Sequence, residues 1–139
     1  FSYKLKVQYK QNKKIYAIDN GLRNSIAFRF SEDIGQLYEN VVYIELKRSG
    51  KEIYYWKRTG EVDFLIKEGL KIKELLQVCK NVSDKKIKAR EIKGLMEASK
   101  EFKVRKAKVI TEDYHNKEKI NGVDIEFIPL WLWLLEESN

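Results

Sequence analysis

A segment near the middle of the chain carries polar residues that could bind a metal ion. Asp63 lies within EVDFLIK (61–67), which alternates like a strand although aspartate is depleted in strands. Glu61 shares its predicted face, and Gln77 is polar inside a second strand-like segment, 71–79. Neighbouring strands bring matched side chains to within about 5 Å. Oxygen ligands of this kind suit Mg²⁺, which could activate a water molecule for phosphodiester cleavage.

A helix predicted over residues 33–50 supplies Glu39 and Glu45 as further candidates. Glu45 falls near the centre of an apolar stripe, where a carboxylate is costly unless it is paired, hydrogen-bonded or metal-bound. For Glu45, a structural pairing with Arg23 or Arg90 and a ligand role both remain open. Val42 and Leu46 lie on a face that adjoins the stripe, and a helix that is apolar over so wide an arc is expected to be largely covered. The stripe itself consists of Ile34, Leu37, Val41 and Ile44.

A solvated surface is the competing interpretation of these polar residues. Polar side chains on one face of an edge hairpin usually face water, and this interpretation is favoured for Glu61. For Asp63 and Gln77 the spacing alone does not decide between a site and a surface.

The segments that would position these residues alternate between strand and helix patterns. Because a helix predicted over 84–101 connects strand 71–79 to strand 107–111, we expect these two strands to be parallel. We predict an α/β fold in which a mixed central sheet is flanked by helices, as a single domain over 1–139. It divides into an N-terminal hairpin (1–19) and a core (20–139). The other predicted elements are strands 1–9, 14–19, 52–57, 61–67 and 123–128 and a short helix after Pro129.

The composition restricts the classes of partner and compartment. A net charge of +7 attracts nucleic acid, although lysine-rich surfaces also occur without such a role. Cys79 is the only cysteine, so no disulfide can form within the chain, and a reducing cytoplasm is expected. His115 lies among polar residues and predicts a surface loop instead of a zinc site. The longest apolar run, Leu130–Leu135, is too short to cross a membrane.

Seven segments, in order over residues 14 to 135, resemble the C-terminal domain of a large class of AAA-type P-loop ATPases of archaea and bacteria. The resemblance implies a PD-(D/E)xK, restriction-endonuclease-like core, preceded by an ATPase domain that binds ATP and by a winged-helix segment. The phosphate loop GxxxxGK[ST] does not occur in this sequence, and the chain begins at Phe1 without a Met, so we expect a fragment of a longer ATPase. The segments are KIYAIDNGL, GQLYENVVYIEL, YYWKRTGEVDFLI, LLQVCKNVSD, AREIKGL, KVITED and IEFIPLWLWLL.

The resemblance also assigns roles to residues. It implies that Glu39 is the helix glutamate, Asp63 the hairpin aspartate and Gln77 the first position of the (D/E)xK element, and that these three would hold Mg²⁺ in an active enzyme. The lysine position of that element is then Cys79, which cannot replace an ammonium group. Lys67 could be a migrated substitute, and Arg90 could contact phosphate or pair with a carboxylate; an exposed strand end is favoured for Lys67.

These expectations favour an accessory domain with a degenerate nuclease site that binds DNA or a partner. The alternatives are an active Mg²⁺-dependent DNA endonuclease and a protein-interaction module without affinity for nucleic acid. We also predict that Asp63, Gln77 and either Glu39 or Glu45 meet in one cleft. Five aromatic residues could serve the core or an interface, with the core favoured: Tyr54, Tyr55, Trp56, Trp131 and Trp133.

Overall fold

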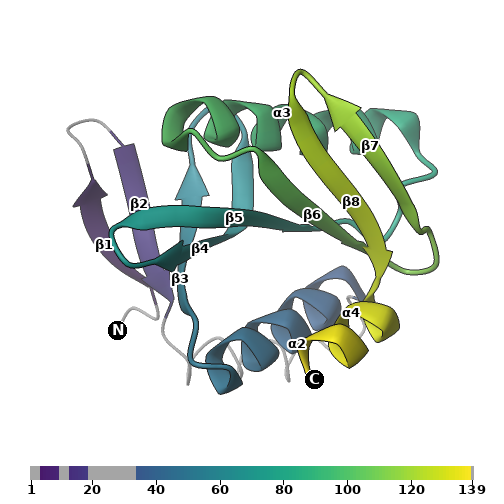
Figure 1. The fold of residues 1–139 in the computed structure, drawn as a ribbon, viewed down its shortest axis with the longest axis horizontal. Coiled ribbons are helices and arrows are strands. Elements are labelled where there is room, and N and C mark those ends of the chain that lie inside the picture. Colours follow the sequence, from purple (N-terminus) through teal and green to yellow (C-terminus); the bar gives the residue numbers. More distant parts are fainter. Residues whose placement is uncertain (1–3, 10–12, 19–33, 139) are drawn as a thin grey trace.

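The fold is a mixed sheet with helices on both faces, seen in a computed structural model that describes residues 4–9, 13–18 and 34–138. In Figure 1, α2 and α4 lie below the sheet and α3 lies above it. The predicted mixed α/β sheet flanked by helices is confirmed. The helices are α2 (Ile34–Arg48), α3 (Lys85–Phe102) and α4 (Leu130–Glu137). The strands are β1 (Lys4–Tyr9), β2 (Lys13–Ile18), β3 (Glu52–Lys57), β4 (Glu61–Glu68), β5 (Lys71–Val78), β6 (Lys106–Thr111), β7 (Asn116–Ile120) and β8 (Val123–Pro129).

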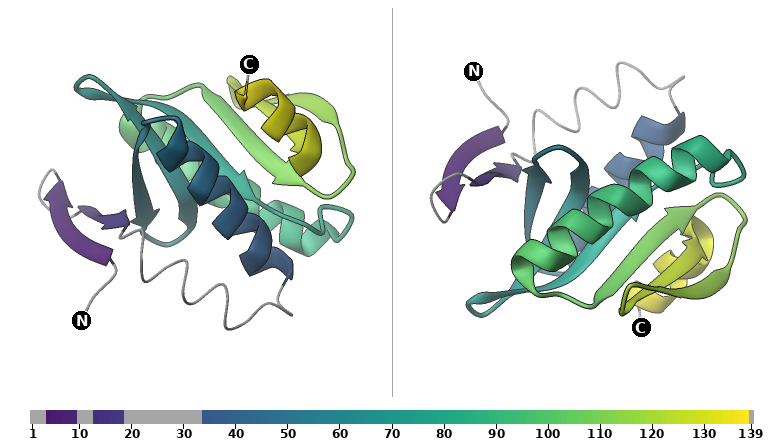
Figure 2. Two further views of the ribbon diagram at one scale, coloured as in Figure 1. Left: turned by 90° about the horizontal axis from the view of Figure 1, so that it is seen from below. Right: turned by 90° about the horizontal axis from the view of Figure 1, so that it is seen from above.

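The described strands form one sheet in the order β1-β2-β3-β4-β5-β6-β8-β7. From β1 to β5 each strand is antiparallel to the next, so the N-terminal hairpin extends the same sheet. β5 and β6 are parallel, as predicted, because α3 connects them across one face (Figure 2). β7 was not predicted, since its sequence NKEKI lacks the apolar alternation that marks a half-buried strand. Segment 22–32, for which the sequence predicts no element, lies outside the described residues.

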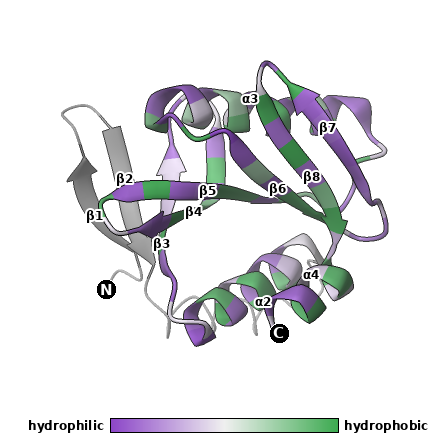
Figure 3. Ribbon diagram, in the orientation of Figure 1, coloured by the Kyte–Doolittle hydropathy of each residue, from purple (hydrophilic) through white to green (hydrophobic). Residues whose placement is uncertain are grey.

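Apolar side chains fill two layers, one on each face of the sheet. On the α3 side, Trp56 and Leu95 are fully buried, and on the α2 and α4 side Tyr43 and Trp133 are equally enclosed. Of the five aromatic residues in question, Trp56 and Trp133 therefore serve the core, whereas Trp131 is 61% exposed. In contrast to the central strands, the edge strand β7 is hydrophilic along most of its length (Figure 3).

The buried face of α2 differs from the predicted stripe. Val42, Tyr43 and Leu46 are buried against the sheet, whereas Leu37 and Ile44 are 41% and 44% exposed. The apolar residues of this helix cover a wide arc, and periodicity alone does not select which part of such an arc faces the sheet. The large side chain of Tyr43 is instead fully buried between α2 and the sheet. The prediction that the apolar arc is covered is confirmed for Val42 and Leu46 and was wrong for Leu37 and Ile44.

Candidate functional site

The strands β4 and β5 separate at the position where the candidate residues lie. Regular pairing ends at Phe64 and Leu76. Beyond that point the side-chain amide of Gln77 fills the gap between the strands. The Asp63 N–H donates to Gln77 Oε1 at 2.7 Å, and Gln77 Nε2 donates to the Glu61 carbonyl at 2.8 Å. The amide of Gln77 therefore replaces a main-chain peptide group in the ladder.

The Asp63 side chain bridges the same gap from β4 to β5. Its Oδ2 accepts a hydrogen bond from the Val78 N–H at 2.8 Å. β5 meanwhile continues along β6, since the Cys79 N–H donates to the Ile110 carbonyl at 2.8 Å. The structure thus brings Asp63 and Gln77 together, as the sequence predicts. Asp63 is half-buried, whereas Gln77 is only 1% exposed.

Glu91 of α3 faces this pair of residues and was missed in the sequence. Burial raises the pKa of its carboxyl to about 7, and the negative charges of Asp63 and Glu61 add to the increase while Arg90 opposes it. The resemblance instead implied a role for Arg90, the residue that precedes Glu91. The signal that could have found Glu91 is its helical spacing, since it lies three residues before Gly94 on the same flank of α3.

Cys79 occupies the position where the resemblance implies a lysine. Its side chain is 3% exposed and belongs to the hydrophobic cluster under α3. Burial, with a contribution from Glu91, raises the pKa of the thiol to about 11. A neutral thiol in this environment can neither carry positive charge nor deprotonate a water molecule at neutral pH.

Close contacts with α3 hold the β3–β4 hairpin that carries these residues. Gly94 lies against the main chain of Glu61, and a Cβ on Gly94 would overlap that carbonyl oxygen. Gly60 is equally confined, because a Cβ there would lie 2.8 Å from the Gly94 Cα. Glu97 accepts hydrogen bonds from the Gly60 N–H at 2.7 Å and from the Thr59 hydroxyl. The turn of the hairpin is therefore fixed to the middle of the helix.

Glu101 fastens the hairpin one helical turn further along. It accepts a hydrogen bond from Trp56 Nε1 at 3.2 Å and an ion-paired one from Arg58 at 3.1 Å. The Glu101 side chain is 3% exposed, and the hydrogen bonds from Arg58 and Trp56 offset part of the cost of burying this carboxylate. Glu91, Glu97 and Glu101 thus form a flank of α3 that faces the hairpin.

The remaining predicted residues lie in other environments. Glu45 pairs with Arg48 at 2.6 Å, one turn along α2, and this hydrogen bond lowers the pKa of the Glu45 carboxyl. Arg48 is thus a partner that the sequence analysis did not consider. Lys67 lies at the far end of β4, about 13 Å along the strand from Asp63, and its ammonium is 3.6 Å from Glu52.

Arg90 of α3 and Glu39 of α2 are the two remaining helix residues that the resemblance singled out. Arg90 is exposed and acts on the site by its charge, lowering the pKa of both Cys79 and Glu91. Glu39 is half-buried on α2, and Arg23 lies outside the described residues. Within residues 34–138, no group of three or more His, Cys, Asp or Glu side chains is placed to hold a metal ion. The meeting of Glu39 with Asp63 in one cleft stays a prediction.

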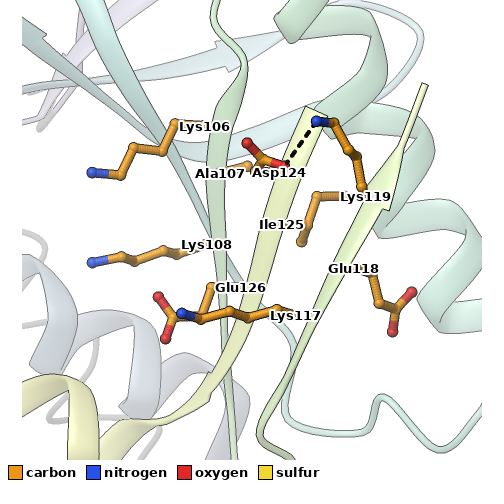
Figure 4. Close-up of a pocket in the computed structure, with 9 residues that line it drawn as sticks. All are labelled: Lys106, Ala107, Lys108, Lys117, Glu118, Lys119, Asp124, Ile125 and Glu126. Carbon is orange, nitrogen blue, oxygen red and sulfur yellow. Dashed lines mark ion pairs between the residues drawn. The ribbon is translucent and has the colours of Figure 1, made fainter. Parts of the chain in front are cut away.

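A separate hollow of about 430 Å³ lies on the opposite edge of the sheet, over β6, β8 and β7 (Figure 4). Its polar side chains alternate in charge from strand to strand. Lys119 approaches Asp124 at 3.8 Å, and Lys108 approaches Glu74 of β5 at 3.7 Å. Opposite charges on neighbouring strands stabilise a sheet, so this surface has a structural explanation. Its charged lining residues that face the hollow include Lys106, Lys108, Lys117, Asp124 and Glu126.

The helices give no sign of a membrane span. In the part of the chain that the structure describes, none is both long and apolar enough to cross a bilayer.

Comparison with known proteins identifies relatives but no activity. The chain is 40% identical over 147 residues to an uncharacterized protein of Methanocaldococcus jannaschii, an alignment that covers 97% of this chain and 32% of that protein. An uncharacterized protein of Haemophilus influenzae is 27% identical over 124 residues, with 88% of this chain and 29% of that protein covered. The chain thus spans about a third of the length of these curated relatives. No solved structure matches it.

The region shared with a recognised protein family begins at α2 and ends in α4. Residues 34–133, which include Asp63, Gln77 and Glu91, match the family described as "Domain of unknown function (DUF4143)". The match covers more than half of the chain. This chain is therefore a member of the DUF4143 family.

Proposed function

We propose that this chain is an accessory, nuclease-like domain of a longer P-loop ATPase, in which catalysis has been lost and the domain acts by binding DNA. The seven resembling segments and the mixed sheet support the nuclease-like fold. The relatives of roughly three times this length leave room for further domains in the same polypeptide. The ATPase and winged-helix domains of that polypeptide would be the constant partners.

The observation that carries the loss of catalysis is the use of Gln77. Both polar atoms of its amide are hydrogen-bonded to the main chain of β4, at 2.7 and 2.8 Å. A metal ion would have to compete with the Asp63 N–H for the Gln77 Oε1, and turning the amide toward the ion would break both buried hydrogen bonds, at roughly 1–3 kcal/mol for each group left unsatisfied. Gln77 is also neutral, and Mg²⁺ is held chiefly by charged oxygen ligands.

The second strand position supports the same conclusion. A nuclease of this type needs a group that orients or deprotonates the attacking water, and such a group contributes about 10²- to 10⁴-fold. The Cys79 thiol is buried and has a pKa raised to about 11. Lys67, the proposed substitute, is bound toward Glu52 at the far end of the strand. Neither residue offers the missing function.

An active Mg²⁺-dependent endonuclease is the second candidate, and one observation favours it. Glu91 has a pKa raised to about 7, partly because Asp63 and Glu61 place negative charge beside it. A divalent cation would relieve this repulsion, so Glu91 could supply the carboxylate that Gln77 lacks. Saturable binding of Mg²⁺ or Mn²⁺, measured by calorimetry and abolished by Glu91→Gln, would support this candidate.

A protein-interaction module without affinity for nucleic acid is the third candidate. It is favoured by exposed apolar side chains on α2 and α4, which contact one another. Ile44 is 44%, Trp131 61% and Leu135 56% exposed. Such surfaces often mark contacts with another domain. Binding of this chain to the remaining two thirds of the longer relative, lost in a Trp131→Ser variant, would support it.

A titration of labelled duplex DNA tests the binding part of the proposal. With a net charge of +7, the chain is expected to bind weakly, and its affinity is expected to fall steeply as the salt concentration rises. Fluorescence anisotropy between 50 and 200 mM salt, as a rough working range, measures this slope. If no binding occurs even at the lowest salt concentration, DNA is excluded as the ligand and the interaction module becomes the leading candidate.

A further inference from the structure

We infer that the outer face of α3 is the surface that contacts the phosphate backbone of nucleic acid. This inference rests on the proposed DNA binding and adds to it the location of the contact and the chemistry recognised, a run of phosphodiesters. α3 lies across the sheet with its outer side uncovered by any other described element (Figure 2, right).

Three lysines follow one line along the outer side of this helix. Lys86, Lys93 and Lys100 are spaced seven residues apart, which places them on nearly the same side and about 10 Å from one another along the helix axis. All three are exposed, and Lys85 and Arg90 flank the line with exposed side chains of their own. A linear array of cations on this scale matches a linear polyanion better than a single small anion.

Ion pairs do not compensate these cations within the described part of the chain. Lys86, Lys93 and Lys100 form no ion pair there, although nine other pairs link charged residues across the same region. Two acidic residues of α3 lie near this line without forming an ion pair with it. The positive charge of Lys93 contributes to lowering the pKa of the Glu97 carboxyl, and Lys100 lines a hollow together with Glu97 and Glu101. Glu97 and Glu101 are directed toward the hairpin, where main-chain and side-chain donors occupy them. The positive charge of the outer face is therefore available to a ligand.

Helix stability does not explain the lysines at the N-terminal end of α3, whereas Lys100 lies in the last turn, where a cation interacts favourably with the helix dipole. The first turn of α3 contains Lys85 and Lys86 and no acidic residue. Cations at a helix N-terminus oppose the helix dipole, each by roughly 0.3–1 kcal/mol. The Asp84 side chain caps this end by accepting from the Lys86 and Ile87 N–H groups. The two lysines thus cost stability where they are, which fits a binding role better than a structural one.

The basic surface continues into a hollow at the C-terminal end of α3. This hollow has a volume of about 590 Å³, and its charged lining residues are Lys100, Lys103 and Arg105, without an acidic residue. Lys103 has a left-handed backbone conformation, with φ 57° and ψ 44°. Glycine usually takes that position at the end of a helix, so a lysine there gives up some stability and adds a cation to the hollow.

The chemistry of the outer face favours nucleic acid over a lipid bilayer. Helices that lie on membranes combine a basic face with large apolar residues that insert among the acyl chains. The exposed apolar residue between Lys86 and Lys93 is Ala89, which is too small to offer such an anchor. The apolar residues of α3, including Leu95, face the sheet. A phosphate backbone requires only the cations.

The test compares two triple variants of the full 139-residue chain that remove equal charge from different faces. K86Q/K93Q/K100Q neutralises the outer line, and glutamine preserves helix propensity. K106Q/K117Q/K119Q neutralises three exposed lysines of the sheet face shown in Figure 4 and serves as the matched control. Affinity for a labelled DNA duplex is measured at several salt concentrations, with a duplex RNA of equal length as a second probe.

We expect K86Q/K93Q/K100Q to weaken duplex DNA binding by roughly 10- to 100-fold at low salt. The slope of log K against the logarithm of the salt concentration should become shallower by about 2–3. The control variant should change both the affinity and this slope by much less. A parallel loss with duplex RNA would assign the face to the phosphate backbone in general. Equal losses in both variants would show that only bulk charge matters and would overturn the inference. Unchanged binding by the outer variant would also overturn it. Failure of the unmodified chain to bind would instead remove the proposed function.

Discussion

The two flanks of α3 use charge in opposite ways. The flank facing the hairpin carries Glu91, Glu97 and Glu101, and two of these carboxylates are hydrogen-bonded to the β3–β4 hairpin. The outer flank carries Lys86, Lys93 and Lys100, which form no ion pair among the described residues. Glu97 and Glu101 accept hydrogen bonds that hold the hairpin, whereas the three lysines are exposed to solvent. The exposed side of α3 therefore keeps three lysines whose charge no ion pair of the described residues offsets.

The difference predicts that substitutions on the inner flank change stability. Gly94→Ala is expected to give the largest effect, because the added methyl group overlaps the main chain of Glu61. We expect the free energy of unfolding to fall by about 2–3 kcal/mol, even though alanine favours a helix by about 1 kcal/mol over glycine. Chemical denaturation measures the change.

The control for this variant is Ala89→Gly on the exposed side of the same helix. It is expected to cost about 1 kcal/mol, the intrinsic propensity difference alone. If Gly94→Ala proved neutral or stabilising, the hairpin would not be held against the helix as closely as described.

Glu91 makes the contribution of the inner flank to stability depend on pH, because the pKa of its carboxyl is raised to about 7. This value lies above the ordinary glutamate value of 4.5, so the folded chain holds the proton more tightly than the unfolded chain. The resulting stability is complete below about pH 4.5 and is lost as the pH rises through about 7, by an amount on the order of 1–3 kcal/mol.

The measurement is the difference in unfolding free energy between the unmodified chain and Glu91→Gln from pH 4 to 8, a range set by the linkage argument at roughly these limits. Other titrating groups cancel in this difference. We expect the variant to become the more stable of the two at the alkaline end. A difference that is independent of pH would contradict a buried, repelled carboxyl at this position.

The outer flank is expected to show the smallest effect on stability. K86Q/K93Q/K100Q should change the free energy of unfolding by no more than about 0.5 kcal/mol, as is usual for exposed substitutions. Thermal and chemical denaturation beside the sheet-face control variant measure this. A large destabilisation would mean that these lysines have structural partners, and their use as a free binding surface would be untenable.

Much of the fold could be predicted from periodicity and turn signals. Strand β3 and the parallel pairing of β5 with β6 follow the sequence prediction closely, because alternation and a crossover helix leave few options. β7 could not be predicted, because an edge strand with a solvated face needs no apolar residues. The part of the α2 arc that faces the sheet could not be predicted, since the burial of Tyr43 depends on the strands opposite it.

The candidate site was less accessible to sequence reasoning. The sequence led to the prediction that Asp63, Gln77 and a glutamate of α2 share one cleft, and of this the structure shows the Gln77 amide bonded to the main chain of Asp63. The sequence could not predict that the Gln77 amide forms hydrogen bonds with the main chain of β4, because these bonds depend on where β4 and β5 separate. Glu91 lies 28 residues from Asp63 in sequence. Only the packing of Gly94 on the hairpin brings the two carboxylates near each other.

The proposed loss of catalysis is tested most directly by incubating plasmid and linear DNA with the purified chain and Mg²⁺ or Mn²⁺. Asp63→Asn is the matched control, because it keeps an oxygen that can accept from the Val78 N–H while it removes the charge. We expect the DNA to remain intact, at the same level in both samples. Metal-dependent cutting by the unmodified chain that disappears in Asp63→Asn would contradict the degenerate site and establish an active nuclease.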